Sequence, residues 1–197
     1  MTRSRDIQMR DELVRWFEQR PMKTAIAATL TFKPELWEKP YEPDKVTFSQ
    51  GAVKSKLKRS RARRVGRVHH SRLMLDEVVS AVRMYCRRLN YRAYGAAFKR
   101  GNARLAVIPI REGGFGAYDK RPHYHMQIEV PPGWSVADWI ETASYEWQKI
   151  RWASDAQNKF EPVTSEGWYG YIAKLRDKPS YGDAIDWENL WSNRASE

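Results

Sequence analysis

The chain has 197 residues, which suits one domain with a sizeable core and appendages. Its formal net charge of +11 predicts an anionic partner, and its nine tryptophans and ten tyrosines include rings on which unpaired bases can stack. Most of the tryptophans are nevertheless expected in the core. The single cysteine, Cys86, excludes an internal disulfide framework and a cysteine-based zinc cluster.

Two features of the composition bear on localisation. No stretch approaches ~20 consecutive apolar residues, and residues 1–6 lack the apolar segment of a signal peptide. We therefore expect a soluble cytoplasmic protein with no membrane partner.

The N-terminal part predicts a helix, a strand and an irregular segment. Residues 6–20 carry a narrow apolar stripe and stop at Pro21, as an appended helix would. Residues 24–33 are apolar and partly β-branched, which is typical of a buried central strand. Prolines make residues 35–43 an irregular excursion.

A dense basic run follows. It holds eight positive charges and no acid: Lys54, Lys56, Lys58, Arg59, Arg61, Arg63, Arg64 and Arg67. A solvated face is the ordinary interpretation of such a run, but this density favours contacts with the phosphates of nucleic acid. His69 and His70 come next, and we interpret them as surface or phosphate-contacting residues.

The middle of the chain predicts a helix followed by strands. Ser71 is a candidate cap for a helix that stops at Asn90. Its apolar stripe is Leu75, Val78, Val79, Val82, Cys86 and Leu89. Residues 91–98 are a strand candidate. Residues 104–112 form the next strand, and Pro109 within it requires an edge position or a bulge.

A loop over residues 113–122 returns the chain into residues 123–130 as an antiparallel hairpin. In the returning strand, His123 and His125 point to one face with Cα atoms roughly 6.5 Å apart. Tyr124, Met126, Ile128 and Val130 then face the core. Two such imidazoles can share one metal ion, or they can be merely solvated or hydrogen-bonded.

The C-terminal part predicts a helix, a strand and another helix. Ser135 opens the first helix with Asp138 as its capping partner, and residues 158–163 are a strand candidate. Thr164 or Ser165 then caps a helix in which Tyr171 and Lys174, three residues apart, lie on one side. The alternative is a half-buried aromatic beside a snorkelling lysine.

A His-hydrophobe-His strand followed by Tyr-x-x-Lys resembles the replication-initiator (Rep) branch of the HUH endonuclease superfamily. The resemblance implies an α+β fold with a central antiparallel sheet and helices on one face, in the RRM-like order β-α-β-β-α-β-α. It divides the chain into an appended helix (1–23), an HUH endonuclease domain (24–178, with a basic insertion at about 34–70) and a tail (179–197).

The resemblance also implies roles for individual residues. His123 and His125 would bind Mg²⁺ or Mn²⁺ with an acid from the adjacent strand, for which Glu112 is the candidate and Asp119 the runner-up. Glu129 lies about 13 Å along the strand from His125, too far for direct ligation. The Tyr171 oxygen would attack the scissile phosphate to give a 5′-phosphotyrosyl enzyme, with Lys174 favouring the phenolate and balancing charge.

The expected function is therefore that of a plasmid- or phage-encoded initiator, in a bacterial host, that nicks and rejoins single-stranded DNA at a replication origin. No Gly-x-x-x-x-Gly-Lys-Ser/Thr loop is present, so host helicase and polymerase are the expected partners. The alternatives are an HUH-type transposase and a non-catalytic origin-binding or single-strand-binding module. Metal-dependent nicking separates the enzymes from the binding module.

We predict that neutralising half of the basic run between Lys54 and Arg67 weakens binding to all DNA sequences alike, because phosphate contacts carry no sequence information. The salt dependence of the affinity should flatten, since fewer counterions are released. Binding titrations over a series of salt concentrations measure both effects. Cleavage of saturating substrate should survive. An unchanged salt slope would make the run a solvated face.

Overall fold

The computed structural model describes five stretches of the chain: residues 2–19, 22–38, 69–115, 120–164 and 181–191. These fall into two compact units. The larger unit is formed by Met1–Lys33 and Met74–Glu197, and the smaller by Pro34–Leu73.

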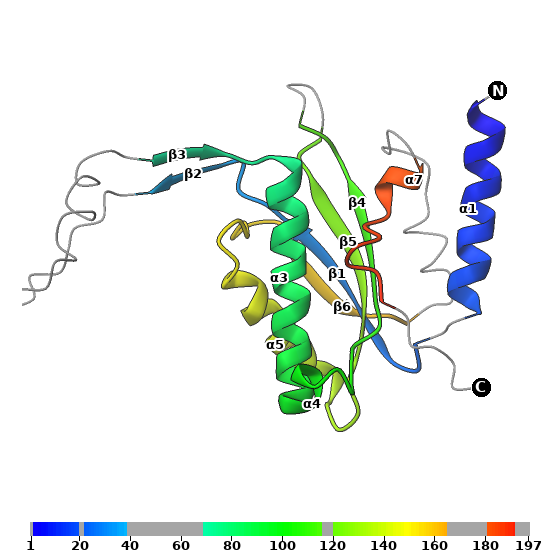
Figure 1. The fold of residues 1–197 in the computed structure, drawn as a ribbon, viewed down its shortest axis with the longest axis vertical. Helices are drawn as coiled ribbons and strands as arrows, with labels where there is room; N and C mark the ends of the chain where they lie inside the picture. The colour runs from blue at the N-terminus through cyan, green and yellow to red at the C-terminus, as the bar shows by residue number, and fades with distance from the viewer. Residues whose placement is uncertain (1, 20–21, 39–68, 116–119, 165–180, 192–197) are drawn as a thin grey trace, which may run out of the picture. The chain divides into compact units, whose positions relative to one another are not determined.

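A four-stranded antiparallel sheet forms the centre of the larger unit (Figure 1). Its strands, in spatial order, are β4 (Val107–Glu112), β5 (His123–Glu129), β1 (Ala25–Thr31) and β6 (Lys159–Pro162). Within the larger unit, the strands and long helices that come after β1 along the chain are α3, β4, β5, α5 and β6. The predicted α+β class and the antiparallel sheet are confirmed.

Successive side chains of β5 point to opposite faces of the sheet, as the alternation of its sequence predicts. Tyr124, Met126 and Ile128 are fully buried, and they pair with β1 residues that are equally inaccessible: Leu30, Ala28 and Ile26. Two helices, α3 (Leu75–Tyr94) and α5 (Val136–Gln148), lie on one side of the sheet and cover this core face (Figure 1).

Aromatic packing joins the two helices to the sheet. Trp147 of α5 meets Phe32 and Tyr85 edge to face, with ring centroids 5.3 Å apart in both pairs. The Tyr85 hydroxyl donates to the carbonyl of Ala143 across the helix pair. These contacts combine apolar burial with a satisfied polar group, as a buried tyrosine requires.

The predicted boundaries of α3 were wrong at both ends. Ser71 does not cap the helix but lies in a strand. The cap is Met74, whose backbone N–H donates to the side chain of Glu77. Asn90 is not a stop, because the helix continues to Tyr94 and ends where Gly95 adopts a positive φ of 50°.

Residues 91–98 are therefore helical and not a strand. The end of α3 leads through Gly95 into a short helix, α4 (Ala96–Lys99). Tyr91, Tyr94 and Phe98 gave this segment its strand-like composition, but the two tyrosines stand three residues apart on one side of α3, and Phe98 lies in α4.

A second layer covers part of the opposite face of the sheet (Figure 1). It consists of α1 (Thr2–Glu18) and the short α7 (Tyr181–Ala184). A small apolar cluster joins these elements to β4: Leu13, Phe17, Ile108, Ile110, Ala184 and Ile185. Helices therefore lie on both faces of the sheet, whereas they were expected on one.

Strand β4 lies at the sheet edge, as Pro109 requires, and the C-terminal segment lies along that edge. Backbone bridges pair Ile110 with Ile185 and Val107 with Trp191, and the Pro109 carbonyl accepts from Asp186 N–H at 3.2 Å.

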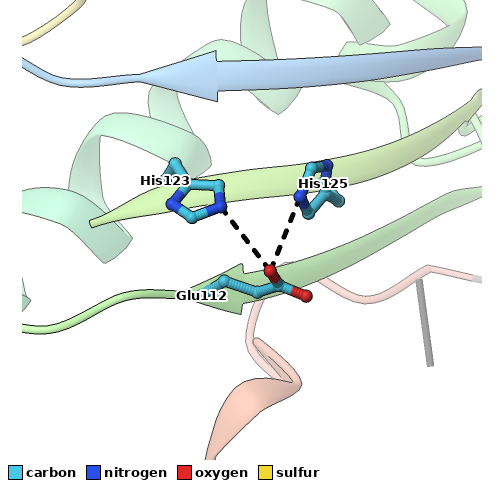
Figure 2. Close-up of side chains that lie close together, drawn as sticks. All are labelled: Glu112, His123 and His125. Atoms are coloured by element: carbon cyan, nitrogen blue, oxygen red, sulfur yellow. Dashed lines mark ion pairs between the residues drawn. The ribbon is translucent and has the colours of Figure 1, made fainter. Parts of the chain in front are cut away.

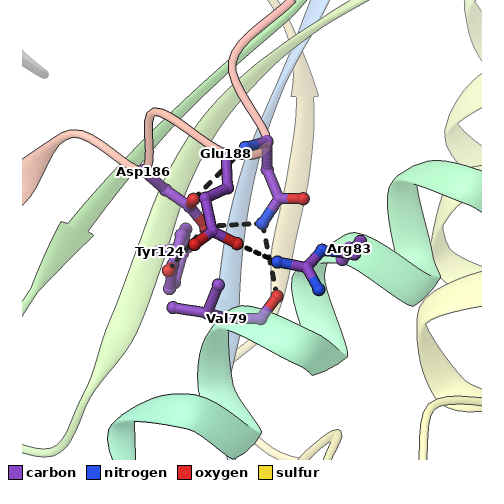
Figure 3. A network of polar contacts seen from close by, with 6 residues as sticks. Val79, Arg83, Tyr124, Asp186 and Glu188 are labelled. Atoms are coloured by element: carbon purple, nitrogen blue, oxygen red, sulfur yellow. Dashed lines mark hydrogen bonds and ion pairs between the residues drawn. The ribbon is translucent and has the colours of Figure 1, made fainter.

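The buried Asp186 side chain ties this segment to the core (Figure 3). It accepts from the Tyr124 hydroxyl at 3.0 Å and from the Asn189 side-chain amide at 2.7 Å. The same Asn189 amide donates to the carbonyl of Val79 on α3. Three elements distant in sequence are thereby joined by one polar network.

The smaller unit contains a two-stranded antiparallel pair, β2 (Glu35–Glu38) and β3 (His69–Arg72). Residues 35–38 are thus a strand and not the start of an irregular excursion. The exposed His70 faces Glu35 across the pair, with Nε2 and Oε2 3.2 Å apart. Within the described residues of both units, no helix is long and apolar enough to cross a membrane.

An ion-pair network joins α3 to α5. Buried Glu146 of α5 accepts from Arg88 at 2.6 Å and from Arg92 at 2.8 Å. Burial raises the pKa of the Glu146 carboxyl, but the two guanidinium groups outweigh it and hold this pKa below the usual 4.5. Because the folded-state pKa is depressed, the network stabilises the fold above the ordinary carboxyl range, and this contribution is lost as pH falls through the depressed value.

We predict that Glu146→Gln lowers the free energy of unfolding by about 1–3 kcal/mol at neutral pH, because two charge-assisted hydrogen bonds are weakened. The difference from wild type should disappear in acid, where the wild-type carboxyl is protonated. Denaturant unfolding at several pH values measures it. As a control, Asp155→Asn removes an exposed carboxylate and should lower the free energy of unfolding by less than about 0.5 kcal/mol. A deficit that persists in acid would contradict the prediction.

Candidate metal centre

Three potential metal ligands converge on one side of the β4–β5 hairpin (Figure 2). Strand pairing brings them together, because Glu112 lies directly opposite His123 in the register, and His125 follows two residues later on the same face. The sequence-based expectation that these three side chains lie side by side agrees with their positions.

The distances suit a shared ion. Nε2 of His123 and Nε2 of His125 each lie 3.6 Å from the same oxygen, Oε2 of Glu112. One ligand atom from each residue falls within 4.8 Å of the others. Two ligands each about 2.1 Å from an ion, at octahedral or tetrahedral angles, lie roughly 3.0–3.5 Å apart. The three side chains thus need only a small adjustment to bind one ion.

Partners on the far side of each imidazole orient the rings. Nδ1 of His123 lies 2.9 Å from the carbonyl of Arg121, and a carbonyl oxygen can only accept, so Nδ1 carries the proton. The Nε2 lone pair of the neutral ring is then directed at Glu112 and available to a metal. Nδ1 of His125 lies 3.2 Å from the Thr29 hydroxyl, which can fix its ring in the same way.

The site is partly shielded from solvent but still open. The side chains of His125 and Glu112 are each 12% exposed, and that of His123 is 19% exposed. The Glu112 carboxylate, chiefly through hydrogen bonding, raises the pKa of His123 above its usual 6.5, while burial opposes the shift. The carboxylate therefore attracts a cation to this position, whether a proton or a metal ion.

A glycine closes the hairpin next to the ligands. Gly113 follows Glu112 directly and has a φ of +80°. A Cβ at this position would overlap the carbonyl groups of Lys120 and Arg121. The second of these carbonyls is the one that accepts from His123, so the close backbone approach at Gly113 helps position both Glu112 and His123.

Glu129, the other acid on the histidine face of β5, lies too far along the strand for direct ligation. Glu129 instead accepts from the backbone N–H of Ala106, at 2.9 Å. Asp119, Tyr171 and Lys174 lie outside the described residues. So do the basic residues Lys54, Lys56, Lys58, Arg59, Arg61, Arg63, Arg64 and Arg67. Their proposed roles remain predictions.

Thr29 is the site residue that the sequence analysis missed. It lies directly opposite His125 in the pairing of β1 with β5. Within a mostly apolar strand, a threonine that falls on the histidine face was the available signal, but the register between the two strands was needed to interpret it.

No protein-family model, curated protein or solved structure matches this chain. Any functional assignment therefore depends on the chemistry of the site itself.

We predict that the protein binds Mn²⁺ and that His125→Ala weakens this binding by more than about tenfold, since loss of even a supporting partner costs that much at many metal sites. Isothermal titration calorimetry measures the affinity. Protons compete for His123, so the affinity should begin to fall at a pH above the usual histidine value of 6.5 as the solution is acidified. The control is His70→Ala, which alters an exposed histidine outside the cluster. Equal Mn²⁺ affinity in the two variants would refute the site.

Proposed function

We propose that the protein is a replication initiator of the HUH type, which nicks and rejoins single-stranded DNA at a replication origin. The observation that carries this proposal is the cluster of Glu112, His123 and His125. Two histidines and a carboxylate with open coordination positions suit Mg²⁺ or Mn²⁺ when the substrate is a phosphate, because phosphate and water oxygens complete the coordination.

The arrangement of the sheet supports the proposal. The elements of the larger unit follow in the order β1, α3, β4, β5, α5 and β6, and the sheet order is β4-β5-β1-β6. This order supports the proposal, because an RRM-like HUH domain would have its elements in the order β-α-β-β-α-β. The two histidines lie on the central strand β5, on the face opposite α3 and α5, where a further helix would have to present the tyrosine.

The proposed reaction is a phosphoryl transfer to a tyrosine. The Tyr171 oxygen forms a bond to phosphorus as the bond from phosphorus to the 3′ oxygen breaks, and a proton completes the released 3′-hydroxyl. Lys174, three residues after Tyr171 in the sequence, would favour the phenolate and balance charge on the phosphate. A metal ion held by Glu112, His123 and His125 would supply Lewis acidity at the scissile phosphate. Rejoining is the same exchange in reverse.

The basic character of the chain supports a DNA substrate. The run from Lys54 to Arg67 would hold the strand through its phosphates, independently of sequence. Unwinding and synthesis would come from the host helicase and polymerase, and the released 3′-hydroxyl would prime the polymerase.

We predict that Tyr171→Phe abolishes a covalent protein–DNA adduct formed with single-stranded origin DNA and Mn²⁺, while DNA binding stays nearly unchanged. The reason is that only the phenolic oxygen is lost. Tyr169→Phe is the matched control, since this ring lies about 160° from Tyr171 around a helix and cannot face the same metal. Denaturing electrophoresis detects the adduct and mass spectrometry locates it.

An adduct that persists in Tyr171→Phe would assign the nucleophile elsewhere. Absence of any adduct from the wild-type protein, with intact binding of single-stranded DNA, would favour the non-catalytic binding module over both the initiator and a transposase.

A further inference from the structure

A large groove lies beside α3, in the helix layer and away from the metal-binding face of the sheet. Its volume is about 1070 Å³. One wall comes from α3, and others come from α4, from Arg104 and from the C-terminal segment that includes Trp191. All of these belong to the larger unit.

The groove is cationic. Six basic side chains line it, against two carboxylates, Glu146 and Glu188. The carboxylates already neutralise some of this charge, since Glu146 pairs with two arginines and Glu188 with Arg83 (Figure 3). Within the described part of the chain, the exposed Arg87 makes no ion pair, so its guanidinium is available to an anionic ligand.

Aromatic rings also line the groove and remain accessible. Tyr91 is 51% exposed and Trp191 is 38% exposed. Arg104 lies over the Trp191 ring at 3.1 Å from its centroid, and Lys99 lies over Tyr91 at 5.1 Å. Each ring therefore has a cation on one face and can accept a second flat group on the other.

The spacing along α3 matches a linear ligand. Arg83, Arg87 and Tyr91 follow at intervals of four residues, so they lie in one row along the helix, roughly 6 Å apart. Because Arg83 already pairs with Glu188, Arg87 is the guanidinium of this row that can bind a phosphate. The exposed ring of Tyr91 lies one turn further on, which suits a chain in which anions and flat groups alternate. Bases in a duplex stack on one another, so only unpaired bases gain from such rings.

We propose that this groove binds single-stranded nucleic acid, with phosphates on Arg87 and unpaired bases stacked on Tyr91 and Trp191. It is a second binding surface, in a different layer of the fold from the candidate metal centre. The proposal does not depend on the nuclease activity, and it is tested in the presence of a chelator.

The test is the affinity for a fluorescein-labelled oligothymidylate, measured by fluorescence anisotropy. Arg87→Glu should weaken binding by about tenfold and reduce the salt slope by about 0.7, the contribution of one phosphate contact. Tyr91→Ala should weaken it by about fivefold or more through lost stacking. Both side chains are exposed, so the thermal unfolding midpoint should not change.

Matched controls change the same residue types outside the groove. Arg15→Glu on α1 makes the same charge reversal at an exposed position, and Tyr145→Ala on α5 removes a ring that is 54% exposed. Both controls should bind within about twofold of wild type. An oligonucleotide carrying 5-iodouracil should also crosslink on irradiation to Tyr91 or Trp191, as located by mass spectrometry.

Four results would overturn the proposal. Groove variants that bind like their controls, or crosslinks found only outside the groove, would show that the strand binds elsewhere. An equal loss of affinity for duplex DNA would show that bases are not recognised. A loss of affinity for polyglutamate with unchanged DNA binding would identify an acidic protein as the partner. The chelator removes metal-dependent cleavage from every measurement, which separates this test from that of the nuclease.

Discussion

The register of β5 between β4 and β1 is the constraint on which both the core and the candidate metal centre depend. It places Tyr124, Met126 and Ile128 under the helices and His123 and His125 on the other face. A shift by one residue would bury the histidines and expose the largest side chains of the strand. The apolar core therefore holds the ligands in register, and the geometry of the site is as stable as the packing beneath it.

The C-terminal segment has a comparable role at the edge of the sheet. It pairs with the backbone of β4, the strand that carries Glu112, and the Asp186 side chain connects it to Tyr124 in the core. The same segment supplies Glu188 and Trp191 to the groove beside α3. One short stretch of chain thus pairs with the strand that carries a candidate metal ligand and also forms part of an aromatic, basic surface.

Local periodicity was enough to predict the histidine face and the hairpin, and the missing N–H of Pro109 predicted an edge position or a bulge. Local periodicity failed where contacts between distant parts of the chain determine the structure. Asn90 was taken as a helix stop, but its side chain donates to the Cys86 carbonyl and accepts from Leu105 N–H, so it is a buried connector within a continuing helix. Thr29 was missed for a related reason, because the sequence of β1 alone does not show which residue of β5 lies opposite it.

Gly113 contributes no functional group to the candidate metal centre, yet the close backbone approach that it permits helps position two of the three candidate ligands, Glu112 and His123. A side chain added at position 113 would therefore disturb the candidate centre, although glycine itself supplies no ligand. A diagnostic pattern for relatives of this protein would therefore begin with the dipeptide Glu-Gly at the end of one strand and continue to His-x-His on the next. A carboxylate without the following glycine would be a poor match even if both histidines were kept.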